Sequence, residues 1–182
     1  QALLANIAGM YAVYHGYEGI KEIANTIHRM ANTLAKNLEN LGFEIKHSAF
    51  FDTLFISLKD TEKLKTIAEN ASMNFYYNDN SVQISIDETS SLEDLALIVS
   101  VFKEYGTTIQ TSENHEFVIP SELHRSSKFL QHDVFNLYRS ETELMRYIKK
   151  LENKDLSLMH AMIPLGSCTM KLNAAVELEP LS

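Results

Sequence analysis

One long amphipathic pattern constrains the fold of this chain of 182 residues more than any other feature. Within residues 17–41, apolar side chains recur every third or fourth position, and polar side chains lie mostly opposite them. This spacing predicts a helix with one face packed on a core, and Gly42 marks its end. The apolar positions are Ile20, Ile23, Ala24, Ile27, Met30, Ala31, Leu34, Ala35, Leu38 and Leu41.

A shorter helix is expected before this one, over residues 2–14. Apolar residues dominate all of its faces, which is typical of a helix that is buried on every side. His15 and Gly16 would close it, because glycine readily adopts the backbone conformation that ends a helix. The first forty residues therefore predict two successive helices.

The following residues predict an α/β arrangement. The expected strands lie at residues 43–47, 53–58, 74–77 and 82–86, and the expected helices at residues 60–71 and 91–106. The turn-rich residues 78–81 favour a hairpin between the last two strands. Ser90 or Ser91 would begin the second helix, with Glu93 and Asp94 in its first turn, where the helix dipole favours anions.

Regular periodicity stops after Gly106. Residues 107–131 are typical of a linker or wrapping segment, because they lose any apolar repeat. Helicity is expected again from Ser140, which can cap a helix together with Glu143 in a capping box.

Composition excludes several classes of protein. Sixteen basic and twenty-four acidic residues give a net charge of −8, which argues against nucleic acid or an anionic membrane as the main partner. One cysteine provides no disulfide framework, and no apolar run approaches the length of a membrane span, so we expect a soluble, reducing compartment. The histidines are too scattered to predict a metal site.

A polar cluster near the end of the chain is the main candidate for chemistry. Ser167, Cys168, Thr169 and Lys171 follow Pro164 and Gly166, which favour a tight turn with free backbone N–H groups. A structural turn explains this cluster as simply as an active-site loop does. The spacing is not that of a phosphate-binding P-loop, and Cys168 has no neighbouring histidine that would make it a nucleophile.

The same segment carries a family resemblance. Residues 161–175, AMIPLGSCTMKLNAA, resemble the corresponding segment of the glycine decarboxylases, which are the pyridoxal-phosphate-dependent P-proteins of the glycine cleavage system. Residues 132–158, 1–38 and 50–56 are similar to earlier segments of that family in the same order. The resemblance therefore covers most of the chain.

The resemblance implies an α/β fold and a division of the chain. The family has two aminotransferase-like halves of pyridoxal-phosphate fold-type I. Residues 1–106 would form the small C-terminal α/β domain of the first half, residues 107–139 a linker, and residues 140–182 the helix and turn that begin the second half. The chain would then be an internal piece of a longer polypeptide.

The resemblance also implies a reaction. The family decarboxylates glycine on pyridoxal phosphate and passes the aminomethyl group to the lipoyl arm of the H-protein, and a dimer is expected. The compartment would be the cytoplasm in a bacterium or the mitochondrial matrix in a eukaryote. The family's Schiff-base lysine belongs to a His-Lys motif, which this sequence lacks, so the isolated piece is expected to be inactive.

Site residues are carried over only where the turn matches. The resemblance implies that Ser167, Thr169, Lys171 and Asn173 lie on the substrate or cofactor side of the cleft, and that Cys168 is a redox-sensitive thiol at its entrance. Two alternatives stay open: a non-catalytic interaction module of a larger complex, and a part of another fold-type I enzyme. Cofactor binding by the longer polypeptide would separate an enzyme from a scaffold.

Overall fold

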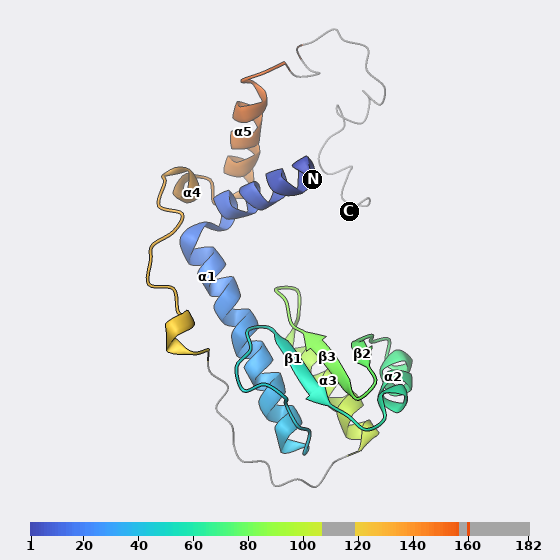
Figure 1. Ribbon diagram of the computed structural model, residues 1–182. Coiled ribbons are helices and arrows are strands. Elements are labelled where there is room, and N and C mark those ends of the chain that lie inside the picture. Colours follow the sequence, from blue (N-terminus) through green and yellow to red (C-terminus); the bar gives the residue numbers. More distant parts are fainter. Residues whose placement is uncertain (107–118, 157–159, 161–182) are drawn as a thin grey trace. The chain divides into compact units, whose positions relative to one another are not determined.

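The computed structural model describes residues 1–106, 119–156 and 160, which belong to two compact units (Figure 1). The terminal unit consists of Gln1–Tyr17 and Leu130–Ser182, and the sheet unit of Glu18–Phe129. This grouping follows packing within the chain, and it differs from the expected segments 1–106, 107–139 and 140–182. Those segments describe a longer polypeptide and stay a prediction.

Helix α1, Ala2–Asn40, contains the two helices that the sequence predicts. Gly16 interrupts it with φ 62° and ψ −170°, so the helix is kinked at the expected position. A Cβ atom at Gly16 would collide with the carbonyl oxygen of Phe135 and lie 2.6 Å from Nη2 of Arg139. Both the positive φ and this close approach therefore require glycine here.

The described part of the sheet unit contains a three-stranded antiparallel sheet in the order β1-β3-β2. Its strands are β1, Thr53–Ser57, β2, Tyr76–Asn78, and β3, Ser81–Ser85, and β2 and β3 form the predicted hairpin. The predicted strand at residues 43–47 is wrong as a full strand, because it consists of one bridge between Ile45 and Ile56. The N–H of Phe43 donates to the carbonyl oxygen of Leu38 in the turn that ends α1. Because Phe43 belongs to this turn, only the few residues after it can pair with β1.

One face of the sheet carries the core. Residues of the second part of α1, of α2, Thr61–Asn70, and of α3, Leu92–Tyr105, pack in one cluster with alternate residues of β1 and β3. The strand residues in this cluster are Leu54, Ile56, Val82 and Ile84, and the helical ones include Leu34, Leu38, Leu64, Leu95 and Phe102. The register pairs Leu54 with Ile84 and Ile56 with Val82, so the intervening residues face the other side.

Side chains cap both short helices of the sheet unit, and the cap at Ser91 confirms the sequence prediction. Asp60 accepts a hydrogen bond from the N–H of Lys63 at 3.0 Å and so caps α2. Ser91 and Asp94 form a capping box at the start of α3, in which each side chain accepts from the other residue's backbone N–H. A short 3₁₀ turn, Ser121–Leu123, is the other helical element of this unit in the described residues.

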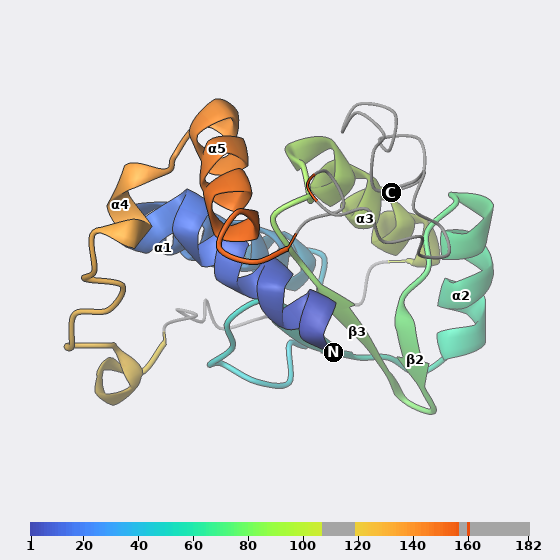
Figure 2. The same cartoon turned by 90° about the horizontal axis from the view of Figure 1, so that it is seen from above.

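The terminal unit contains the first part of α1, a single turn α4, Val134–Leu137, and α5, Glu141–Glu152. Ser140 caps α5 as predicted, and its hydroxyl both accepts from the N–H of Glu143 and donates to that carboxylate. Figures 1 and 2 both place α5 beside the first part of α1. The prediction that residues 2–14 form a buried helix is wrong here, since Leu3 and Leu4 each keep 69% of their surface exposed.

Candidate functional site

The predicted site residues lie outside the described residues. These are Ser167, Cys168, Thr169, Lys171 and Asn173. Their roles therefore stay predictions, and the candidate sites below come from the described part of the chain.

Within the part of the chain that the structure describes, three titratable groups have a perturbed pKa, and each has a structural cause. Burial raises the pKa of Tyr77 in β2. The pKa of Asp87 is lowered chiefly by the hydroxyl of Thr89, and that of Asp94 by the hydroxyl of Ser91, because these hydrogen bonds favour the carboxylate. None of the three lines either of the hollows described below. Tyr77 is a packed ring, Asp87 belongs to a turn and Asp94 to a helix cap, so these shifted pKa values have structural causes.

His28 also has a structural role. Its Nδ1 lies 2.8 Å from the carbonyl oxygen of Phe51, and its Nε2 lies 3.2 Å from the amide nitrogen of Asn32. Because a carbonyl oxygen only accepts, Nδ1 carries the hydrogen and donates it. The imidazole also stacks on the Phe51 ring, with 5.9 Å between the two ring centroids. His28 therefore fixes the loop before β1 to α1.

The terminal unit contains an apolar groove of about 720 Å³ between the first part of α1 and α5. The residues along it are Leu3, Asn6, Ile7, Met10, Tyr11, Tyr14 and His15 of α1 and Leu144, Ile148, Leu151 and Glu152 of α5. Aliphatic and aromatic side chains dominate this lining. The groove is suited to burying another apolar surface, because it offers few groups for proton transfer or for binding an anion.

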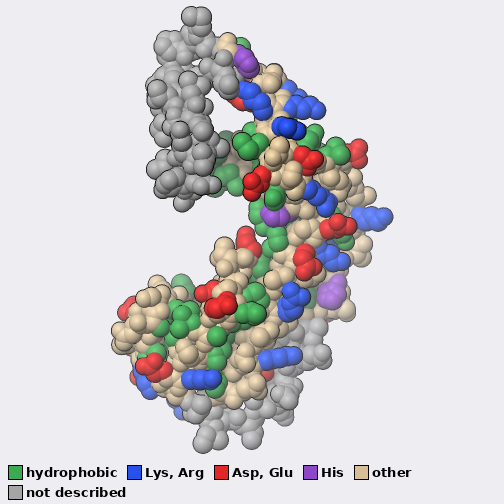
Figure 3. Space-filling view, turned by 180° about the vertical axis from the view of Figure 1, so that it is seen from behind, with side chains coloured by type: hydrophobic (Ala, Val, Ile, Leu, Met, Phe, Trp, Pro, Cys, Tyr) green, Lys and Arg blue, Asp and Glu red, His purple; other side chains and the backbone are tan. Residues whose placement is uncertain are grey.

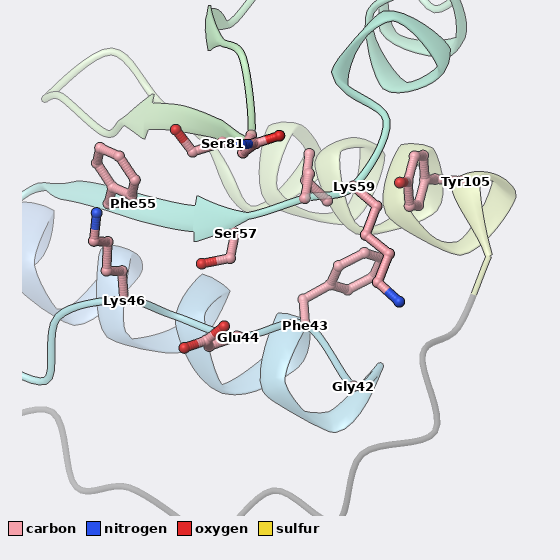
Figure 4. A pocket seen from close by; sticks show the side chains of 11 residues that line it. Gly42, Phe43, Glu44, Lys46, Phe55, Ser57, Lys59, Ser81 and Tyr105 are labelled. Atoms are coloured by element: carbon pink, nitrogen blue, oxygen red, sulfur yellow. The ribbon is translucent and has the colours of Figure 1, made fainter.

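The sheet unit contains a more polar hollow, here called the outer-face pocket (Figure 4). It has a volume of about 420 Å³, and its lining joins outward-facing residues of the sheet to Phe43, Leu58 and Tyr105 at the margin of the core. Its lining consists of Gly42, Phe43, Glu44, Lys46, Phe55, Ser57, Leu58, Lys59, Asn80, Ser81 and Tyr105. Backbone hydrogen bonds hold its frame, including Leu58 N–H to Asn80 O at 2.9 Å.

Three adjacent chain segments place a row of polar side chains across this pocket. The N–H of Ser57 donates to the carbonyl oxygen of Glu44 at 3.0 Å, and the register pairs Ser57 with Ser81. Because Ile45 and Ile56 face the core, their neighbours point to the outer face. A carboxylate and two hydroxyls therefore stand side by side, at the spacing of cross-strand neighbours, about 5 Å.

Cationic and aromatic groups border this row. Lys46 lies over the Phe55 ring, with its Nζ 4.7 Å from the ring centroid. Lys59 extends the β1 segment two residues beyond Ser57. Tyr105 is fixed in place, because its hydroxyl accepts from the N–H of Asp60 at 3.2 Å and its carbonyl oxygen accepts from Nζ of Lys63 at 2.8 Å. The pocket thus combines both signs of charge with an apolar floor.

The chemistry of the outer-face pocket is that of binding. Neither histidine nor cysteine occurs among its lining residues, so it lacks the commonest general base and the thiol nucleophile. Sequence analysis predicted β1, but it placed Ser81 in the hairpin turn and Glu44 in a strand that consists of one bridge, and it did not single out Glu44, Ser57, Lys59 or Ser81. The outward alternation within residues 53–57 and 81–85 was the available signal, but only the register brings these residues together.

The described residues hold no group of three or more His, Cys, Asp or Glu suited to a metal ion. Their helices include none with both the length and the apolar character needed to cross a membrane. On the face seen in Figure 3, the acidic and basic side chains of the described residues are interspersed.

Comparison with known proteins identifies the family. The family model described as "Glycine cleavage system P-protein" matches residues 1–102. The chain belongs to the glycine cleavage system P-protein family. It is 54% identical to a glycine dehydrogenase (decarboxylating) of Christiangramia forsetii, 52% to one of Flavobacterium johnsoniae and 49% to one of Vibrio vulnificus. Each match covers 100% of this chain and 20% of the relative, so the chain spans about a fifth of the length of these P-proteins.

The described residues do not fit the pyridoxal phosphate that this family implies. A phosphate group is usually held at a helix N-terminus, but no residue of the first turn of α2 or α3 lines the outer-face pocket. The apolar groove has no lysine in its lining. No catalytic step through the cofactor is therefore assigned to these residues.

Proposed function

We propose that this chain is part of a glycine dehydrogenase (decarboxylating), which removes CO₂ from glycine and passes the aminomethyl group to the lipoyl arm of the H-protein. The observation that carries this proposal is the 54% identity to such an enzyme along the whole chain. Identity at this level over every segment supports a shared role as well as a shared fold. The isolated piece is proposed to be inactive.

The structural role that we propose is that of the small domain, linker and entry segment. Residues 1–106 would form the small α/β domain of the first aminotransferase-like half, residues 107–139 the linker, and residues 140–182 the start of the second half. An antiparallel sheet with helices packed on one face supports the first of these assignments. The fold-type I arrangement belongs to the complete protein.

The Ser167–Asn173 turn is proposed to line the cleft. Ser167, Thr169, Lys171 and Asn173 would donate hydrogen bonds to the carboxylate of glycine or to the cofactor, and Cys168 would be a redox-sensitive thiol at the entrance. Pyridoxal phosphate, when bound, supplies the electron sink for decarboxylation. The Schiff-base lysine would come from beyond this piece, because no His-Lys pair occurs in the sequence.

The partners that we propose are the lipoylated H-protein, glycine, the remainder of the polypeptide and a second subunit. The exposed apolar groove supports the contact with the remainder of the polypeptide, since such a surface is unfavourable in water. The same groove is the observation that favours the alternative of a non-catalytic interaction module. The relatives named above are bacterial, which supports the cytoplasm as the compartment.

Borohydride trapping with pyridoxal phosphate tests the proposed function. The chain is compared with a polypeptide extended to the length of the relatives, and both are mapped by peptide mass spectrometry and assayed for CO₂ release from glycine. We expect labelling and CO₂ release only in the extended polypeptide, at a lysine outside residues 1–182. Stoichiometric labelling of Lys171 in the chain alone would overturn the role of the turn, and an extended polypeptide that releases no CO₂ would favour the interaction module.

A further inference from the structure

We propose that the outer-face pocket binds a free α-amino acid with an apolar side chain. The ammonium group of the ligand would pair with the carboxylate of Glu44, and its carboxylate with the ammonium group of Lys59 and the hydroxyls of Ser57 and Ser81. This inference rests on the lining of the pocket and does not depend on the proposed function.

The hydroxyl of Ser81 favours a polar ligand. Ser81 is only 7% exposed, it lines the pocket, and its side chain makes no hydrogen bond to another described residue. In the described residues, the fully buried side-chain atoms without a partner are Asn32 Oδ1 and Tyr77 Oη, so the Ser81 hydroxyl is instead open to the pocket, where it can donate to a ligand. A ligand carboxylate in the pocket would accept this hydrogen bond.

The charges of the lining point to a zwitterion. Among the described residues, Glu44 has no ion-pair partner within reach, and neither has Lys59. Lys46 is already placed over the Phe55 ring, which leaves Lys59 as the better partner for a carboxylate. Lys59 lies two residues beyond Ser57, and Glu44 lies beside Ser57. In Figure 4 the ammonium group of Lys59 lies beside the Phe43 ring and away from Ser57, so this long side chain must turn towards Ser57 when a ligand that carries both charges on one carbon reaches both Glu44 and Lys59.

The apolar floor of the pocket is the reason for proposing a ligand with an apolar side chain. Phe43 and Leu58 are buried beneath it, and the ring of Tyr105 stands at its side. The volume of about 420 Å³ falls within the usual range for small-molecule pockets, roughly 300–1,000 Å³. The pocket thus has room for the backbone of an amino acid and for a side chain of leucine size.

Other ligand classes fit this lining less well. An inorganic anion would face the carboxylate of Glu44, and a divalent cation would find a single carboxylate together with two ammonium groups. Nucleic acid would meet a chain with a net charge of −8. An amino acid is the small ligand whose charges match both Glu44 and Lys59.

Titration of the ¹⁵N-labelled chain with L-leucine tests the proposal by NMR. We expect saturable shifts of the Ser57 and Ser81 amides, with His28 as an unaffected reference. N-acetyl-L-leucine lacks the ammonium group and L-leucinamide lacks the carboxylate, so each should bind about tenfold more weakly, as for the loss of one charged hydrogen bond. The absence of saturable shifts at Ser57 and Ser81, or equal binding of the three compounds, would overturn the proposal.

Variants locate the contacts. Glu44→Gln and Lys59→Met should each weaken L-leucine binding about tenfold, because each removes one charged partner. The matched controls Glu88→Gln and Lys36→Met lie outside the pocket and should bind like the unmodified chain. Preserved amide spectra would establish that the variants fold. Unchanged affinity in both pocket variants would refute the proposed contacts, and because no cofactor or catalysis enters this titration, its failure would leave the proposed decarboxylase function standing.

Discussion

The two parts of helix α1 differ in what surrounds them. In the sheet unit, Leu34 and Leu38 are completely buried, because β1, β3 and α3 contribute to the same core. In the terminal unit, Leu3 and Leu4 are mostly exposed, although the sequence there is more apolar. An apolar pattern therefore shows that a helix needs partners, whereas other elements of the protein decide whether those partners are present.

The largest expected contrast is between two leucine truncations. Leu34→Ala should lower the free energy of unfolding by about 2–5 kcal/mol, because it leaves a cavity in a packed core. Leu3→Ala should change it by less than about 0.5 kcal/mol, as is usual for an exposed position. Urea unfolding of both variants measures the difference. Equal losses would show that the two parts of α1 are buried alike in solution.

The kink between the two parts provides the next contrast. Gly16→Ala should destabilise the terminal unit by about 1–3 kcal/mol, because alanine at a positive φ is strained and its Cβ would meet the backbone of Phe135. Gly9→Ala is the matched control: no atom lies within 4 Å of its added Cβ, and the gain in helix propensity should stabilise α1 by about 0.5–1 kcal/mol. Amide hydrogen exchange in α5 measures both effects, and similar protection in the two variants would contradict the requirement for glycine at the kink.

Two serine caps sharpen the comparison further. Ser91→Ala should lower the free energy of unfolding by about 1 kcal/mol, because α3 contributes to the core of the sheet unit. Ser140→Ala should instead increase hydrogen exchange within α5 and leave the main unfolding transition nearly unchanged, since α5 has no buried residue. Urea unfolding followed by exchange tests both. A large shift of the main transition in Ser140→Ala would mean that the units unfold together.

The smallest effect concerns pH. Asp87 and Asp94 have lowered pKa values in the folded chain, so their contribution to stability is complete above their ordinary pKa of 3.8 and is lost as the pH falls through the lowered value. The double variant Asp87→Asn, Asp94→Asn should therefore lose less stability between pH 5 and pH 3, about the range in which such carboxylates titrate. Urea midpoints across this range provide the measurement, with Lys36→Met as a control. An equally steep acid loss in the double variant would exclude these two carboxylates as its source.

Local chemistry made much of the fold predictable. The spacing of residues 17–41, the break at Gly16 and the caps at Ser91 and Ser140 are each determined by a few neighbouring residues, and the structure confirms them. The strand predicted at residues 43–47 was wrong, because the end of α1 limits how far that segment can pair.

The outer-face pocket was not predictable in the same way. Glu44, Ser57 and Ser81 become neighbours only through the register of three segments that are distant in the sequence. The exposure of residues 2–14 also depends on tertiary partners that composition does not specify. The polar residues that follow Pro164 and Gly166 identified the candidate turn at Ser167, and the family resemblance supported it, but this turn lies outside the described residues.

The shape of the sheet has a consequence for how this piece behaves at high concentration. Strand β2 is an edge of the sheet and is only three residues long, and the segment around Ile45 pairs along the other edge at β1. Long unpaired edges are templates on which a second chain can add a strand, whereas short or covered edges are poor ones. The sheet unit is thus protected against edge-to-edge aggregation, so any self-association of this piece should begin at the apolar side chains of the terminal unit.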